Sequence, residues 1–83
     1  MIVPMVHLNG TSKQSLLNDL DEAFDALDVA FHKLKRTAPN GRDYYLQGID
    51  AIQQATDEHI ARLRKVQNVM DEIQNLMIAI DKQ

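Results

Sequence analysis

Cysteine is absent from the sequence, and glycine and proline are scarce, with three and two residues among 83. Without cysteine the chain forms no disulfide and no thiolate metal site. The glycines and prolines stand almost entirely at the ends of periodic segments, which argues against a disordered linker. A single small domain of this length buries a modest fraction of its surface, and association is a common route by which such chains gain stability.

Long apolar runs and a basic excess are missing as well. No stretch of the chain approaches the roughly 18 apolar residues of a membrane span. The first residues lack the basic region and the length of a signal peptide, which predicts a cytoplasmic location. The formal net charge is −3, whereas a protein that coats nucleic acid needs a basic excess. We therefore expect neither a membrane nor genomic nucleic acid as a partner.

Signatures of catalysis and of metal binding are also lacking. The three histidines, His7, His32 and His59, have none of the paired spacings of metal-binding helices, such as H-x-x-x-H. No glycine-rich phosphate loop is present, and a Ser-His-Asp triad cannot be recognised from sequence because it is spatial. We expect no catalytic residue, no metal and no cofactor, and hence no enzyme.

Two long helical patterns make up most of the chain. In the first, over residues 12–36, apolar residues recur at steps of three and four, as in the seam of a coiled coil. These residues are Leu17, Leu20, Phe24, Leu27, Phe31 and Leu34. Thr11 as the N-cap would place Gln14 at the spacing of a capping box, and Ser12 as the N-cap would start the helix one residue later.

The second pattern covers residues 43–82 and alternates steps of four and three in the same way. Its seam consists of Tyr45, Ile49, Ile52, Thr56, His59, Leu63, Val66, Met70, Ile73, Met77 and Ile80. Gly48 marks a close backbone approach or delays the start of the regular helix. His59 is interpreted as a core histidine that sets register or oligomeric state, or as a ligand or pH-sensing group.

Residues 37–42, between the two patterns, predict a turn. They contain a proline followed by Asn40-Gly41, a strong turn dipeptide, and Asn40 or Asp43 can cap the second helix. We therefore predict an all-α fold in a single domain. It is an antiparallel helical hairpin with a long second helix and a short extended N-terminal arm over residues 1–10.

The two predicted helices differ in length, about 37 Å and about 60 Å at ~1.5 Å per residue. Folding back at the tip would pair Leu34 with Tyr45 and Leu17 with approximately Leu63. The C-terminal half of the second helix would then present an exposed apolar patch. We therefore predict an oligomeric helical bundle, a homodimer or larger. The expected oligomer interface consists of Val66, Met70, Ile73, Met77 and Ile80.

The turn also contains the sharpest candidate for a binding site. A helix N-terminus binds phosphate through free N–H groups, Arg42 adds a bidentate donor, and Tyr44 and Tyr45 offer stacking faces for a base. The predicted ligand-binding residues at the tip are Asn40, Gly41, Arg42, Tyr44 and Tyr45. The alternative is a capped turn in which Tyr45 packs on Leu34 and Arg42 pairs with Asp43.

A second polar cluster, made of His7, Asn9 and Thr11, precedes the first helix. Within one hairpin this cluster lies at the opposite end of the first helix from the tip. The two clusters meet only if a second chain packs antiparallel to the first. A ligand site formed by both clusters is therefore expected at a subunit interface, and the alternative for the second cluster is a plain N-cap.

Two stretches, Val6-His7-Leu8-Asn9-Gly10-Thr11 and Pro39-Asn40-Gly41-Arg42-Asp43-Tyr44-Tyr45, are similar to segments of small helical proteins encoded by phages and prophages. The order helix, Pro-x-Gly-Arg-acid, helix also resembles the phage sponge proteins. Those are helical-hairpin oligomers that sequester the cyclic nucleotide signals of bacterial CBASS and Thoeris defence. This second resemblance covers the tip and the general architecture. It does not extend to the N-terminal arm, the tyrosine pair or the longer second helix.

The resemblance implies a phage counter-defence protein in the cytoplasm of an infected or lysogenic bacterial cell. Gly41 and Arg42 would meet the phosphate of a small nucleotide signal at subunit interfaces, and the protein would act by tight binding without turnover. The competing hypothesis is a coiled-coil protein-interaction module, a scaffold or an inhibitor of a host protein, with no small-molecule ligand. In that case residues 37–48 are only a turn.

Overall fold

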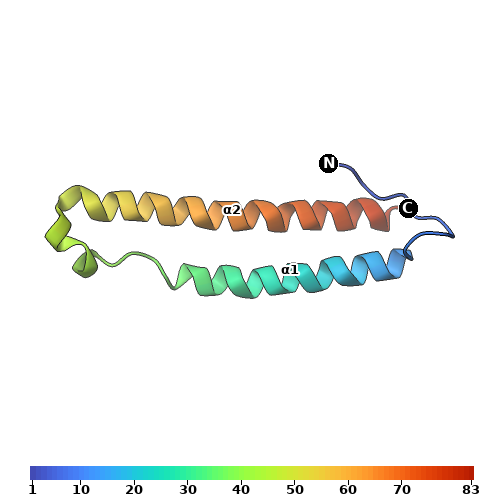
Figure 1. Cartoon of the computed structure of the whole chain (residues 1–83), viewed down its shortest axis with the longest axis horizontal. Helices are drawn as coiled ribbons and strands as arrows, with labels where there is room; N and C mark the ends of the chain where they lie inside the picture. Colours follow the sequence, from blue (N-terminus) through green and yellow to red (C-terminus); the bar gives the residue numbers. More distant parts are fainter.

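The computed structural model describes residues 1–83 and contains two long helices, α1 (Lys13–Lys35) and α2 (Ile49–Asp81). They lie side by side and run antiparallel (Figure 1). Two short 3₁₀-helices, η1 (Gly41–Asp43) and η2 (Tyr45–Gln47), lie between them, and no strand is present. The predicted all-helical hairpin is confirmed. Neither helix is long and apolar enough to cross a membrane.

The start of α1 is fixed by a serine. The hydroxyl of Ser12 accepts a hydrogen bond from the Ser15 N–H at 3.1 Å, so Ser12 and not Thr11 is the N-cap. The Gln14 amide donates to the Asn18 side chain at 2.7 Å instead of completing a capping box. The predicted seam of α1 is half-buried along its whole length, at Leu17, Leu20, Phe24, Leu27, Phe31 and Leu34. The periodicity of the sequence therefore identifies the side of α1 that packs against α2.

The second helix begins at Ile49, so the predicted start at Asp43 is wrong. The Asn40 side chain accepts a hydrogen bond from the Arg42 N–H at 3.0 Å, and it therefore caps η1 and not α2. Gly48 then adopts φ 101° and ψ 165°, a region of backbone conformation that is essentially open only to glycine. Of the two expectations for Gly48, the delayed helix start is confirmed.

The register of the hairpin also differs from the prediction. The Lys13 ammonium donates to the Asp81 carbonyl at 2.8 Å, so the start of α1 lies beside the end of α2. Because both helices rise by about 1.5 Å per residue, Leu34 lies level with roughly residue 60. The predicted pairings of Leu34 with Tyr45 and of Leu17 with Leu63 are therefore wrong. Only the stretch of the connector between α1 and η1 is extended, at up to about 3.3 Å per residue, and η1 and η2 follow it, so that the chain passes the end of α1 before α2 begins (Figure 1).

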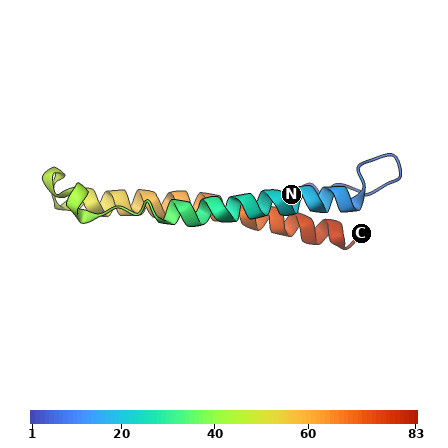
Figure 2. The same ribbon diagram turned by 90° about the horizontal axis from the view of Figure 1, so that it is seen from below.

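This register reverses which half of α2 lacks a helical partner. Met70 and Ile80 are buried within the chain, and with His59 they are its only buried residues. The C-terminal half of α2 thus packs on α1, while the connector runs beside its first turns (Figures 1 and 2). An unpaired C-terminal half was the reason for predicting an interface there, and that reason does not hold.

The molecule is a thin rod of 62 × 21 × 16 Å. Its radius of gyration is 18.6 Å, against about 12 Å for a compact domain of this length. It exposes 6490 Å², whereas a compact monomer of this mass exposes about 5000 Å². The surplus of roughly 1500 Å² follows from two helices that touch along only part of their length.

The N-terminal segment, residues 1–12, contains no helix or strand. The Gln83 side chain accepts a hydrogen bond from the Val6 N–H at 2.8 Å and donates one to the Pro4 carbonyl at 2.6 Å. These bonds hold the segment beside the end of α2. Both chain termini therefore lie in the half of the rod away from the tip (Figure 1).

Candidate functional site

The tip of the hairpin consists of η1, η2 and the first turn of α2. Three large apolar side chains here are almost fully exposed: Tyr45 at 74%, Leu46 at 85% and Ile49 at 89%. We call these three residues the tip patch. Sequence reasoning placed Tyr45 and Ile49 in the buried seam and missed Leu46. The one sequence signal for a later start of α2 is Gly48, because a glycine readily adopts the positive φ that interrupts a helix.

Arg42 lies in η1 and its side chain is exposed. Arg62 with Glu58 is the one ion pair between an arginine or lysine and a carboxylate, and His32 lies near Asp28, so the alternative pairing of Arg42 with Asp43 is not formed. The helix N-terminus that was expected to bind phosphate together with Arg42 does not lie next to it. The N-terminus of α2 comes only after η2, it has no side-chain cap, and Asp50 occupies its first turn. A carboxylate there competes with an anionic ligand for the free N–H groups.

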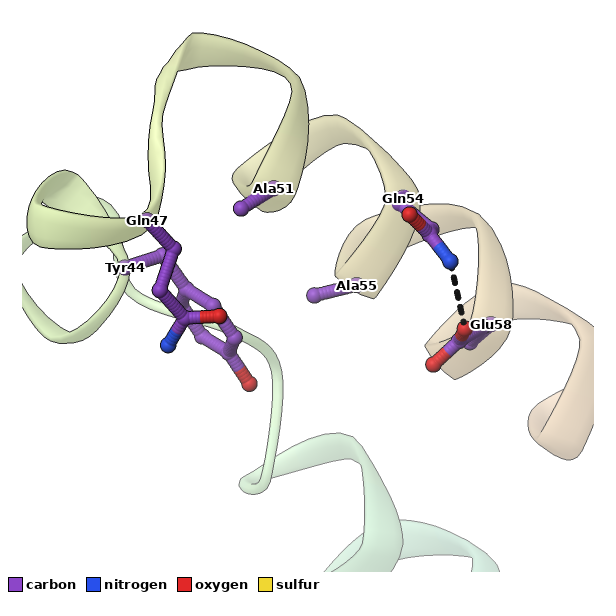
Figure 3. Close-up of a pocket in the computed structure, with 6 residues that line it drawn as sticks. All are labelled: Tyr44, Gln47, Ala51, Gln54, Ala55 and Glu58. Carbon is purple, nitrogen blue, oxygen red and sulfur yellow. Dashed lines mark hydrogen bonds between the residues drawn. The ribbon is translucent and has the colours of Figure 1, made fainter.

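The two tyrosines differ in environment. Tyr45 is exposed and does not pack on Leu34. Tyr44 is half-buried and lines a hollow of about 200 Å³ beside α2 (Figure 3). The hollow is bounded by Tyr44, Gln47, Ala51, Gln54, Ala55 and Glu58.

This hollow is small and carries no positive charge. Ligand pockets for drug-sized molecules measure about 300–1,000 Å³, and this one is smaller. The two alanines open a shallow floor, and the Gln54 amide donates to the Glu58 carboxylate at 3.4 Å along its far rim (Figure 3). Glu58 is the only charged residue that lines it, and Arg42 does not. The tip therefore offers an arginine and a hollow, but in separate places.

The second predicted cluster stands before α1. His7, Asn9 and Thr11 are all exposed. The N–H of Gly10 donates to the His7 carbonyl at 3.2 Å, and a Cβ at Gly10 would lie 2.7 Å from the His7 ring. The cluster is thus a tight turn with the imidazole folded over the glycine. The length of the rod separates it from the tip, as expected for a single chain (Figure 1).

His59 is the one buried polar side chain, at 5% exposure, and its Nδ1 has no hydrogen-bond partner within the chain. It lies in the α2 seam level with roughly residue 35, where α1 ends. Buried polar atoms without a partner weaken a fold by about 1–3 kcal/mol. His59 therefore occupies the packed seam, as expected of a core histidine, without the hydrogen bonds that usually accompany such a position.

A broader, shallow hollow runs along the outside of α2. Asp57, Ile60, Ala61 and Arg64 line it, at the spacing of successive turns on one side of the helix. No group of three histidine, aspartate or glutamate side chains is placed to hold a metal ion. Both hollows are surface features of one helix and its connector.

No protein-family model matches the chain, and neither a curated protein nor a solved structure is significantly similar to it.

Proposed function

We propose that the protein is a protein-interaction module whose working surface is the tip patch together with the first turns of α2. A second polypeptide would cover this surface and complete the helical bundle that one chain leaves unfinished. The observation that carries the proposal is the nearly full exposure of Tyr45, Leu46 and Ile49 next to a helix segment that α1 does not reach.

The energetics support the same function. Each apolar Å² removed from water is worth about 25 cal/mol, so three exposed side chains of this size favour association by several kcal/mol. The surplus exposed area of roughly 1500 Å² exceeds the ~800 Å² that one partner contributes to a standard interface.

A photo-crosslinking amino acid at Leu46 tests the proposal in the cells that express the protein. We expect the crosslinker to capture a polypeptide, either another copy or a different chain, and Ile49→Glu to abolish the capture. The control places the same crosslinker at Asn68, an exposed polar residue in the middle of α2. Absence of any protein adduct from Leu46 would remove the proposal.

Binding of a phosphate-bearing nucleotide is a second candidate, and the unpaired guanidinium of Arg42 favours it. An arginine without a carboxylate partner is free to make bidentate bonds to phosphate. Against this stand Asp50 at the helix N-terminus and Glu58 in the hollow. The counter-defence role inferred from the phage proteins depends on this binding.

Two variants separate specific phosphate contact from general charge. If Arg42 contacts phosphate, Arg42→Ala should weaken binding by about 1.5–3 kcal/mol, the range for a hydrogen bond to a charged group. Lys65→Ala, a basic change away from the tip, should have little effect. The measurement is a thermal-shift panel of cyclic dinucleotides, cyclic trinucleotides and cyclic ADP-ribose isomers. A panel without any shift, or equal effects of the two variants, would exclude a nucleotide site at the tip.

A further inference from the structure

We propose that the chain which covers the tip patch is a second copy, in a two-fold antiparallel dimer that lays the N-terminal segment of each copy on the tip of the other. This inference rests on the proposed interaction function and names the partner. Three features of the rod support this dimer: the distribution of charge along it, the positions of its exposed apolar residues and the area that it leaves uncovered.

The rod has one positive and one negative half. Residues 32–65, which form the tip half, contain seven of the nine basic residues and four of the twelve acidic ones, a formal net charge of +3. The remaining residues, at the half with the termini, contain two basic and eight acidic residues, a net charge of −6. Two parallel copies would place like charges together, whereas two antiparallel copies place each positive half on a negative one.

Exposed apolar side chains gather at both ends of the rod. At one end is the tip patch, and at the other Ile2, Met5 and Leu8 of the N-terminal segment are each at least four-fifths exposed. Within one chain these groups are separated by most of a 62 Å rod and cannot meet. An antiparallel second copy brings the N-terminal segment of each chain to the tip of the other, and it does so twice by symmetry.

Three exposed isoleucines also recur along one side of α2 between the two ends. Ile49, Ile60 and Ile78 are all exposed, and the steps between them, 11 and 18 residues, are close to whole turns of about 3.6 residues. They therefore lie along one line of the helix. A two-fold axis near the middle of α2 sets Ile49 level with approximately Ile78 of the partner subunit.

The two hydrogen bonds between Gln83 and the N-terminal segment fix where that segment would arrive. They hold Pro4 and Val6 beside the end of α2, which is the part of the helix that this axis brings to the partner's tip. The same arrangement carries His7, Asn9 and Thr11 toward Arg42 and Tyr44 of the partner subunit. The two polar clusters that one chain keeps apart would then share one end of the dimer.

The first test is the mass of the protein in solution. Light scattering at micromolar concentration should give twice the 9.4 kDa of one chain. A monomer, a trimer or a larger assembly would overturn the inference. Such a result leaves the interaction function standing if the crosslinker at Leu46 still captures a different protein, so the two failures are distinguishable.

The second test is the relative direction of the two copies. Because the chain has no cysteine of its own, an introduced cysteine is the only thiol that reacts. Met5→Cys and Leu46→Cys variants are prepared separately, one of them tagged, then mixed and treated with a short bismaleimide. We expect the mixture to give several-fold more crosslinked dimer than either variant alone, because the two positions meet only between antiparallel copies. A mixture of Met5→Cys with Asn68→Cys, a mid-rod position, is the matched control.

The result that would overturn the arrangement is equally specific. Efficient crosslinking of Leu46→Cys with itself means that tips meet tips, as in a parallel dimer. A mixture that reacts no better than the Asn68→Cys control means that the N-terminal segment does not reach the partner's tip. Circular dichroism of each variant checks that the two helices are retained.

Discussion

At the scale of single residues, one backbone angle separates η2 from α2. Gly48 has φ 101°, and no atom outside its neighbours in sequence lies within 4 Å of the position that a Cβ would take. A side chain at Gly48 is therefore opposed by backbone conformation alone and not by crowding. This backbone angle lets the chain turn back at the tip, and α2 begins with the residue that follows the glycine.

Replacing Gly48 with alanine should destabilise the hairpin by about 1–3 kcal/mol, the range for a residue held in a sparsely populated backbone region. Gly41→Ala is the matched control, because Gly41 also has open space around its Cβ position but no positive φ. We expect that variant to change the free energy of unfolding by less than about 0.5 kcal/mol, as surface substitutions do. Urea titration followed by circular dichroism measures both, and equal effects would contradict this account of the tip.

His59 gives the opposite expectation at the same scale. Because its Nδ1 is buried without a partner in the chain, His59→Leu should raise the free energy of unfolding by about 1 kcal/mol, near the lower end of the penalty for an unsatisfied polar group. The comparison variant is His32→Leu, since His32 is exposed and its Nδ1 already contacts the Asp28 carbonyl. A His59→Leu variant that is less stable than the wild type would contradict this account of the buried Nδ1.

At the scale of elements, the periodicity of the sequence predicted both helices and the packing side of α1. The predicted seam of α2 is correct from Ile52 onward, where side chains are half-buried or buried. It fails at Tyr45 and Ile49, which are exposed. Periodicity reports which side of a helix is apolar, but it carries no information on how far a connector travels. The path of the connector through η1 and η2 set the register of the hairpin, and the register decides which apolar residues find a partner.

The corrected register makes a prediction within one turn of α2. Met70 is buried against α1, whereas its neighbour Val69 is exposed. Met70→Ala should therefore destabilise the protein by about 2–4 kcal/mol through lost burial and a cavity, and Val69→Ala by less than about 1 kcal/mol. Thermal unfolding measures the difference. A Met70→Ala variant that keeps its stability but loses its oligomeric state would instead support the interface first predicted from sequence.

At the scale of the whole molecule, the candidate sites are determined by the length of the rod. Sequence reasoning identified the turn, Arg42 and the tyrosine pair, and it placed the two polar clusters at opposite ends. It could not foresee that η2 would separate Arg42 from the N-terminus of α2. That separation depends on the hydrogen bond from the Arg42 N–H to the Asn40 side chain and on the positive φ of Gly48. Neither feature changes the periodicity of apolar residues in the sequence.

Salt should weaken the proposed dimer. The attraction between halves of net charge +3 and −6 acts between exposed groups, and such interactions are screened over about 10 Å at 0.1 M ionic strength and about 3 Å at 1 M. We expect the dissociation constant from sedimentation equilibrium to rise several-fold over that range. Sodium sulfate is the informative comparison, because it also strengthens apolar association. A dimer that tightens in sodium chloride would contradict the charge argument.

The small number of buried residues also bears on how long a chain survives in the cell. With three buried residues, a solitary copy opens often, and proteases cleave chains in proportion to the time they spend open. A bound partner keeps the chain closed by mass action. Its lifetime therefore grows with the concentration of that partner, which in the proposed dimer is the protein itself, so copies at low concentration are removed fastest. Pulse-chase half-lives at two expression levels would reveal this dependence as slower turnover at the higher level.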